Sequence, residues 1–248
     1  MLILLPPSEG KTQRRRGGSL QLGDLSFPTL TSLRDEVIAA VEKVSAGPDP
    51  YAVLGVSPNL TEEVARNTRL RTAPTAPAGE VYSGVLYDAL DLPSLDPAAK
   101  RRATRAVVVQ SALFGAVRLS DRIPAYRLSM SVNLPGVGAL AAAWRPELER
   151  VLPQVVGRGV IVDCRSSTYA AAWTPRAELA SRWVQVAVPG ATHMAKHTRG
   201  LVTRELVTAT SAPRSPEALA QALAGRFEVS LAPPPRPGRA WILSASAR

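Results

Sequence analysis

Apolar residues along the chain occur in two patterns: short continuous runs, and longer stretches with helical spacing. A continuous apolar run is typical of a strand that is covered on both faces of a sheet. Such runs predict four buried strands, at residues 1–5, 106–110, 159–164 and 183–188.

The last strands and the helices follow from the remaining patterns. Residues 227–231 and 240–246 are expected to pair around a proline-rich loop. Apolar positions recur at helical spacing in residues 29–45 and 60–71, and Ser215 before Pro216 is typical of a helix N-terminus. Strands and helices alternate, so we expect an α/β (mixed α+β) fold with a central mixed sheet flanked by helices.

The chain is expected to form a single domain over residues 1–248. The proline-rich stretch at residues 72–79 is either a domain boundary or a surface loop. Neither side of it has a pattern that looks self-sufficient, which favours the loop. An apolar content of 46% excludes disorder for the chain as a whole.

Composition excludes several classes of protein. The single cysteine, Cys164, excludes an internal disulfide framework and a multi-cysteine zinc site. No segment approaches the ~20 apolar residues of a membrane span, and the N-terminus lacks a basic region before its short apolar run. We therefore expect a cytoplasmic monomer that needs no membrane and no cofactor.

The net charge is +10, from 30 basic and 20 acidic residues. Such a balance favours an anionic partner such as nucleic acid or a nucleotide. Only four of the basic residues are lysines, so an arginine-rich codon usage is an alternative explanation of the charge.

Three short motifs suggest chemistry but lack an essential part of it. Gly10-Lys11-Thr12 follows a strand, but a phosphate-binding loop needs a glycine where Leu5 stands. His193 and His197 share a helix face without the glutamate of a zinc protease, so we expect no metal site. Cys164 is expected to be buried and inert.

Residues 134–142, Leu-Pro-Gly-Val-Gly-Ala-Leu-Ala-Ala, match the pattern of a helix-hairpin-helix. In that motif Gly136 and Gly138 would turn the backbone, and amide groups at the next helix would hold a DNA phosphate. Arg145 would add a phosphate contact. The alternative is a glycine-rich entry into one helix.

Several segments together resemble the YaaA family of bacterial peroxide-stress proteins. They are the opening run to Lys11-Thr12, Gly79 to Gly84, Leu113-Phe114-Gly115 with Arg118, Asp121 and Tyr126 to Met130, Trp144, Ser166 with Tyr169, and Ala195 to Gly200. The sequence departs from the family pattern at Leu119-Ser120 and at Ser129.

The resemblance implies a compact protein with a basic cleft and a helix-hairpin-helix-like element. It also implies a role in limiting iron-dependent oxidative damage, through non-specific binding of DNA. This is our first hypothesis, and it involves no catalysis.

The second hypothesis is an enzyme or binder for a nucleotide-like or other small anionic metabolite. A single anion site, unlike a DNA surface, needs convergent basic and hydroxyl side chains. The candidate anion-binding residues are Lys11, Ser83, Arg118, Arg127, Lys196 and Arg199. The candidate catalytic residues are Lys11, Tyr82, Ser166, Tyr169 and Lys196, which would orient the ligand or transfer protons.

Overall fold

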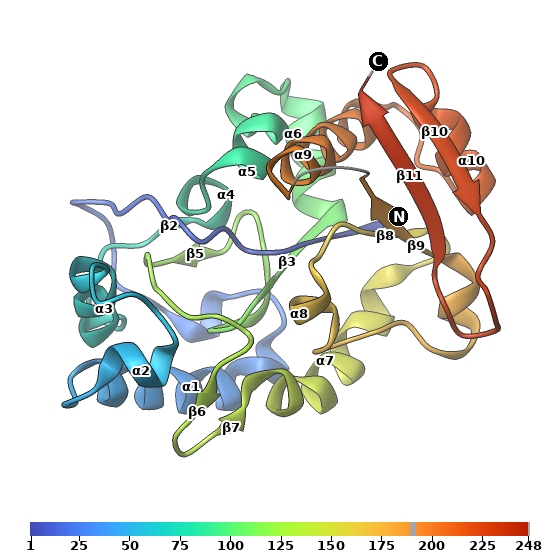
Figure 1. The fold of residues 1–248 in the computed structure, drawn as a ribbon. Coiled ribbons are helices and arrows are strands. Elements are labelled where there is room, and N and C mark those ends of the chain that lie inside the picture. Colours follow the sequence, from blue (N-terminus) through green and yellow to red (C-terminus); the bar gives the residue numbers. More distant parts are fainter. Residues whose placement is uncertain (189–191, 248) are drawn as a thin grey trace.

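A seven-stranded mixed sheet runs through the centre of the protein (Figure 1). The computed structural model describes residues 1–188 and 192–247. From one edge to the other, the strands are β10 (Phe227–Ala232), β11 (Trp241–Ala247), β9 (Trp183–Ala187), β8 (Ile161–Asp163), β1 (Leu2–Leu5), β3 (Val107–Ser111) and β4 (Gly115–Arg118).

The predicted fold class and the four predicted buried strands are confirmed. They form β1, β3, β8 and β9, which run parallel to one another. Residues 2–5 are at most 1% exposed, because helices cover both faces of this part of the sheet. The two C-terminal strands pair with each other as expected, but β11 also pairs in parallel with β9 and so lies inside the sheet.

Helices lie on both sides of the sheet (Figure 1). On one side are α1 (Thr31–Ser45) and α7 (Leu140–Val156). On the other are α5 (Val85–Leu90), α6 (Pro97–Ala106) and α9 (Thr192–Thr208), and α9 contacts both α5 and α6. The remaining helices are α2 (Pro50–Leu54), α3 (Thr61–Arg66), α4 (Ala78–Val81), α8 (Ser167–Ala170) and α10 (Pro216–Leu223).

Local sequence explains two of these helices. The apolar stripe of α1 is completely buried at Val37, Ile38 and Val41. Ser215 caps α10, since its hydroxyl accepts a hydrogen bond from the backbone N–H of Ala218 at 3.1 Å.

The predicted helix-hairpin-helix is wrong. Residues 134–139 belong to a β-hairpin formed by β6 (Asn133–Leu134) and β7 (Gly138–Ala139). A single helix, α7, follows it, and the described residues 124–132 before it contain no helix. Gly136 and Gly138 have φ of 87° and 90°, so these glycines serve a strand turn.

A close contact explains the Leu113-Phe114-Gly115 segment. Gly115 has a φ of 72°, and a Cβ there would lie 2.6 Å from the ring of Trp144. Trp144 is completely buried in α7, and its indole N–H donates to the carbonyl of Ala112 at 2.8 Å. Gly115 therefore allows α7 to dock against the β3–β4 turn.

The chain order of the strands marks a position for ligand binding. The connection from β1 leads to β3 on one side of it, whereas β8 leads to β9 and β11 on the other. In open α/β sheets, the crevice beyond the carboxyl ends of two such strands is where ligands bind. Here that crevice lies beyond Leu5 and Asp163.

Candidate functional site

Polar side chains from distant parts of the chain meet beyond the carboxyl ends of β1 and β3. The loop after β1 is tied to the segment after α4 by an antiparallel bridge between Lys11 and Tyr82. The segment after β5 (Arg122–Ile123), a strand that pairs with β2 (Ala76–Pro77), adds further groups. The side chains at this position are those of Glu9, Lys11, Tyr82, Ser83, Ser111, Tyr126 and Arg127.

Lys11 is the central cation of this group. Its ammonium donates to the carbonyl of Ser8 at 2.6 Å and lies 4.2 Å from the ring centroid of Tyr126 and 5.6 Å from that of Tyr82. A cation over an aromatic face is attracted by the ring. The tyrosines therefore hold the amine in place while they exclude water from it.

The same burial lowers the pKa of Lys11 to about 7. Loss of solvation is the largest cause, and repulsion from the Arg127 guanidinium adds to it. The carboxylate of Glu9 acts in the opposite direction but does not outweigh them. Near neutral pH, this amine can either carry charge or exchange a proton.

A buried chain of hydroxyl groups adjoins the lysine. The Tyr126 hydroxyl lies 2.7 Å from that of Ser111 and 3.1 Å from that of Tyr82. Tyr82 stacks on Tyr87, whose hydroxyl donates to the carbonyl of Pro6. Burial raises the pKa of all three phenols, so each remains protonated at neutral pH.

Two further cations face the lysine loop. The carboxylate of Glu9 lies 4.0 Å from the Arg127 guanidinium and 3.9 Å from the ammonium of Lys196. The backbone of Arg127 is fixed by two hydrogen bonds with the Asn67 side chain, at 2.8 and 2.9 Å. Glu9 is largely exposed, so these ion pairs add little stability.

The two residues near α8 differ in their surroundings. Burial raises the pKa of Tyr169, as does the neighbouring Tyr126, whereas the charge of Arg127 lowers it. Tyr169 therefore lies beside the cluster. Ser166 is exposed, and no hydrogen bond within the described residues connects its side chain to Lys11.

The structure does not bring all the candidate cations together. Arg118 donates to the carbonyls of Thr104 and Arg105 at the end of α6, at 3.2 and 2.7 Å. Its partner across the sheet is Val108, near the opposite end of β3 from Ser111. Arg199 donates to the carbonyl of Val186 in β9 at 3.1 Å.

The candidate DNA-binding residues lie on another part of the molecule. Gly136 and Gly138 are in the β6–β7 hairpin. Arg145, in the first turns of α7, donates to the carbonyl of Ala171 at 3.0 and 3.3 Å. None of these residues lines the cavities beside Lys11.

Sequence reasoning did not select several residues of this site. Glu9 and Tyr126 lie within segments that resemble the family, so the resemblance could have identified them as candidate site residues. No sequence pattern identifies Ser111 or Asn67, because both contribute only through contacts with residues far away in the sequence. The fully buried ion pair of Arg165 with Asp163, at 2.6 Å, was also not anticipated.

That ion pair has a structural role at the end of β8. Both oxygens of Asp163 accept from Arg165, and one also accepts from the indole N–H of Trp183 at 3.0 Å. The Arg165 guanidinium donates in addition to the side chain of Gln110. These bonds fix the backbone beside the crevice.

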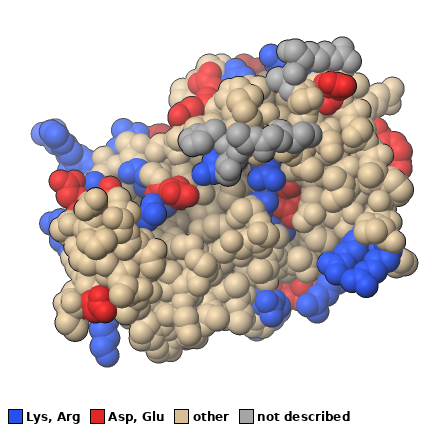
Figure 2. Space-filling model, viewed as in Figure 1, with Lys and Arg blue, Asp and Glu red and all other residues tan. Residues whose placement is uncertain are grey.

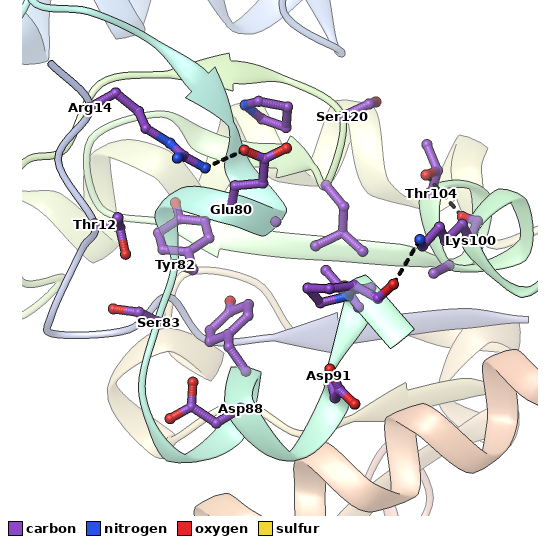
Figure 3. Close-up of a pocket in the computed structure, with 17 residues that line it drawn as sticks. Thr12, Arg14, Glu80, Tyr82, Ser83, Asp88, Asp91, Lys100, Thr104 and Ser120 are labelled. Atoms are coloured by element: carbon purple, nitrogen blue, oxygen red, sulfur yellow. Dashed lines mark hydrogen bonds and ion pairs between the residues drawn. The ribbon is translucent and has the colours of Figure 1, made fainter. Parts of the chain in front are cut away.

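Two cavities adjoin the cluster. The smaller, about 440 Å³, is lined by Glu9, Lys11, Arg66, Tyr126 and Arg127 among others. The larger, about 790 Å³, is shown in Figure 3. Thr12 and Ser83 line both, so the cavities are neighbours.

The remaining motifs contain the two histidines and the single cysteine. Within the described part of the chain, no group of three or more His, Cys, Asp or Glu side chains could hold a metal ion. The side chain of His193 lies outside the described residues. Cys164 is buried, and burial raises the pKa of its thiol to about 12, which agrees with an inert cysteine.

Across residues 1–188 and 192–247, no helix has both the length and the apolar character needed to cross a bilayer.

Comparison with known proteins identifies relatives that match most of the chain. A UPF0246 protein of Streptomyces coelicolor is 50% identical, with 98% of this chain and 97% of the relative covered. A UPF0246 protein of Corynebacterium efficiens is 42% identical over 84% of this chain and 85% of its own length. A Campylobacter jejuni protein is 26% identical over 71% of this chain and 72% of its own.

A family profile gives the same result. The profile described as "Peroxide stress protein YaaA" matches residues 1–231, which include every side chain of the cluster around Lys11. The chain therefore belongs to the YaaA (UPF0246) family of peroxide stress proteins.

Proposed function

We propose that this protein acts in the peroxide stress response by binding a small anionic metabolite of the nucleotide class. The anion would lie among Lys11, Arg127 and Lys196. Arg118 and Arg199 are left out of this site, because their donors are directed to backbone carbonyls. In this proposal the protein works in the cytoplasm as a monomer.

The convergence of two cations on Glu9, beside Lys11, carries the proposal. Lys196 and Arg127 each lie within about 4 Å of its carboxylate, and the charges of Glu9 and Arg127 both act on Lys11. A carboxylate from the chain itself thus marks a position with the charge and geometry that an anionic ligand needs. Tyr82 and Tyr169 would orient such a ligand, and Lys11 would exchange a proton with it.

Thermal unfolding with added phosphates tests this function. A ligand at about 100 times its Kd stabilises the folded protein by about 2.7 kcal/mol, which raises Tm by several degrees. We expect such a shift with nucleoside phosphates, and we expect Lys11→Ala and Arg127→Ala to abolish it. Lys43→Ala, which removes an exposed lysine outside the site, should retain it.

The absence of a shift with every phosphate tried would contradict the proposal. An equal shift in the wild type and in Lys11→Ala would place the ligand elsewhere.

Non-specific DNA binding is a second candidate, and the net charge of +10 favours it. It would protect DNA from iron-dependent damage. Because the glycine-rich segment is a β-hairpin, contacts would come from this hairpin and from Arg145 at the start of α7. This surface is separate from the cluster around Lys11, so the two functions are compatible.

A further inference from the structure

The larger cavity has walls suited to an uncharged group. Apolar side chains from several elements line it, and three of its charged side chains contact other groups of the chain. Arg14 forms an ion pair with Glu80 at 2.5 Å, and the ammonium of Lys100 donates to the carbonyl of Pro93 at 2.9 Å (Figure 3). The apolar lining consists of Pro77, Tyr87, Leu92, Pro93, Ala103 and Leu119.

The larger cavity shares part of its lining with the smaller cavity, which holds the proposed anion site. Thr12 and Ser83 belong to both cavities, and Figure 3 shows them on the same side of the larger one as Tyr82. Ligand pockets typically measure about 300–1,000 Å³, so each cavity can take one part of a single ligand. The hydroxyl groups of Thr12 and Ser83 would face the portion that joins the two parts.

The buried hydroxyl chain has one more proton than its internal contacts use. The hydroxyl oxygen of Ser111 accepts from the backbone N–H groups of Phe114 at 3.0 Å and Leu113 at 3.2 Å. With both lone pairs engaged, Ser111 must donate its proton to Tyr126. Tyr126 and Tyr82 each carry one proton, and the contact between their hydroxyl groups uses only one of the two.

One phenolic proton of this pair is therefore left over. Of the two phenols, Tyr82 is the one that lines the larger cavity. Tyr82 is 2% exposed and lines the larger cavity. A buried donor without an acceptor costs free energy, so an acceptor on a bound molecule would be favoured there.

We propose that the larger cavity binds the uncharged, ring-shaped part of the ligand, and that Tyr82 donates a hydrogen bond to an acceptor on that ring. This inference rests on the proposed anion site, where the phosphate of the same molecule lies beside Lys11 and Arg127. The ligand class that fits both cavities is a nucleoside 5′-monophosphate, in which a heterocycle with carbonyl or ring-nitrogen acceptors is joined to a phosphate through a sugar.

Titration calorimetry with three probes tests this assignment: inorganic phosphate, ribose 5-phosphate and a set of nucleoside 5′-monophosphates. We expect a nucleotide to bind the wild type at least about tenfold more tightly than ribose 5-phosphate, which corresponds to burial of the ring in the apolar cavity. Leu92→Trp, which fills the larger cavity, should remove this advantage and leave the affinity for phosphate unchanged.

Tyr82→Phe tests the donor with little change in shape. It should weaken nucleotide binding about three- to tenfold more than it weakens phosphate binding, the effect of one lost hydrogen bond to the ring. Leu22→Trp, a substitution of a partly buried leucine outside both cavities, is the matched control and should bind all probes as the wild type does.

The outcomes separate this inference from the proposed function. If phosphate and ribose 5-phosphate bind but no nucleotide binds more tightly, the assignment of the larger cavity is overturned and the anion site stands. The same holds if Tyr82→Phe binds nucleotides as well as the wild type does. If no probe binds the wild type, the proposed function itself fails.

Discussion

At the scale of single residues, Lys11 shows how burial decides the chemistry of a charged group. Its amine lies between two tyrosine rings, where loss of solvation outweighs the attraction of Glu9 and lowers its pKa to about 7. An ordinary lysine would be fully charged at this pH. The amine of Lys11 therefore changes its charge within the physiological range.

This shift predicts that anion binding weakens as the pH rises. Above pH 7 the free site holds a neutral amine, so an anion that requires the ammonium must bind together with a proton. Between pH 7.5 and 9.5, where a phosphate keeps its charge, we expect affinity to fall by up to about tenfold per pH unit. Calorimetry over this range measures it, with Lys11→Arg as the control that stays charged and gives a flat profile.

Parallel pH profiles of the wild type and Lys11→Arg would exclude this role.

The lowered pKa of Lys11 also determines how this residue affects stability as the pH changes. Between pH 7 and the ordinary value of 10.5, the unfolded chain binds a proton at Lys11 that the folded chain does not, so this residue makes folding more favourable as the pH rises.

At the scale of elements, the contact between α5 and α9 positions two parts of the site. Helix α9 carries Lys196, and α5 carries Tyr87 beside the larger cavity. A Cβ on Gly200 would lie 2.2 Å from the carbonyl oxygen of Leu86 and 2.7 Å from the Cβ of Ala89. This contact gives a physical reason for the glycine in the Ala195 to Gly200 segment.

Gly200→Ala should therefore destabilise the protein. The close neighbour is backbone, which cannot move aside cheaply, so we expect a net loss of about 1–3 kcal/mol despite the better helix propensity of alanine. Chemical denaturation measures the loss. Gly225→Ala is the matched control, because a Cβ there has no neighbour within 4 Å. A Gly200→Ala protein as stable as the wild type would contradict this account of the helix contact.

At the scale of the whole molecule, part of the net charge can be traced in the structure. On the face in Figure 2, several basic side chains lie next to acidic ones, one group at the lower right is almost entirely basic, and broad areas carry no charge. Part of the net charge of +10 is used within the fold, as by Arg34, which is completely buried and donates to three backbone carbonyls.

If the protein also binds DNA, its affinity should depend steeply on salt and not on sequence. Each neutralised phosphate contributes about −0.9 to the slope of log K against log salt concentration. We expect Arg145→Ala to reduce this slope by about one and to weaken binding to two unrelated duplexes equally. Fluorescence anisotropy measures both effects.

Lys43→Ala removes the same charge from another position and controls for net charge alone. If it weakens binding as much as Arg145→Ala does, the β-hairpin surface has no special role. Binding that is absent or unaffected by salt would exclude this function.

Much of the architecture could be predicted because it depends on local patterns. The apolar runs of β1, β3, β8 and β9 can be stable only with both faces covered, so their sequence predicts buried parallel strands. The N-cap at Ser215 depends only on residues next to it. The helix-hairpin-helix could not be excluded in this way, because the same glycines suit a strand turn, and the chain before them decides between the two.

The sequence by itself determined the fold class, the buried strands and the family, since these follow from patterns within short segments. Tertiary structure alone decided the position of β11 inside the sheet and which of the candidate cations lie together. Arg118 is near the opposite end of β3 from Ser111, whereas Arg127 and Lys196 lie at the loop after β1 that carries Glu9 and Lys11. The physical reason is that crossover connections bring together residues more than a hundred positions apart. A pattern within a short segment therefore cannot predict which of these residues will be in contact.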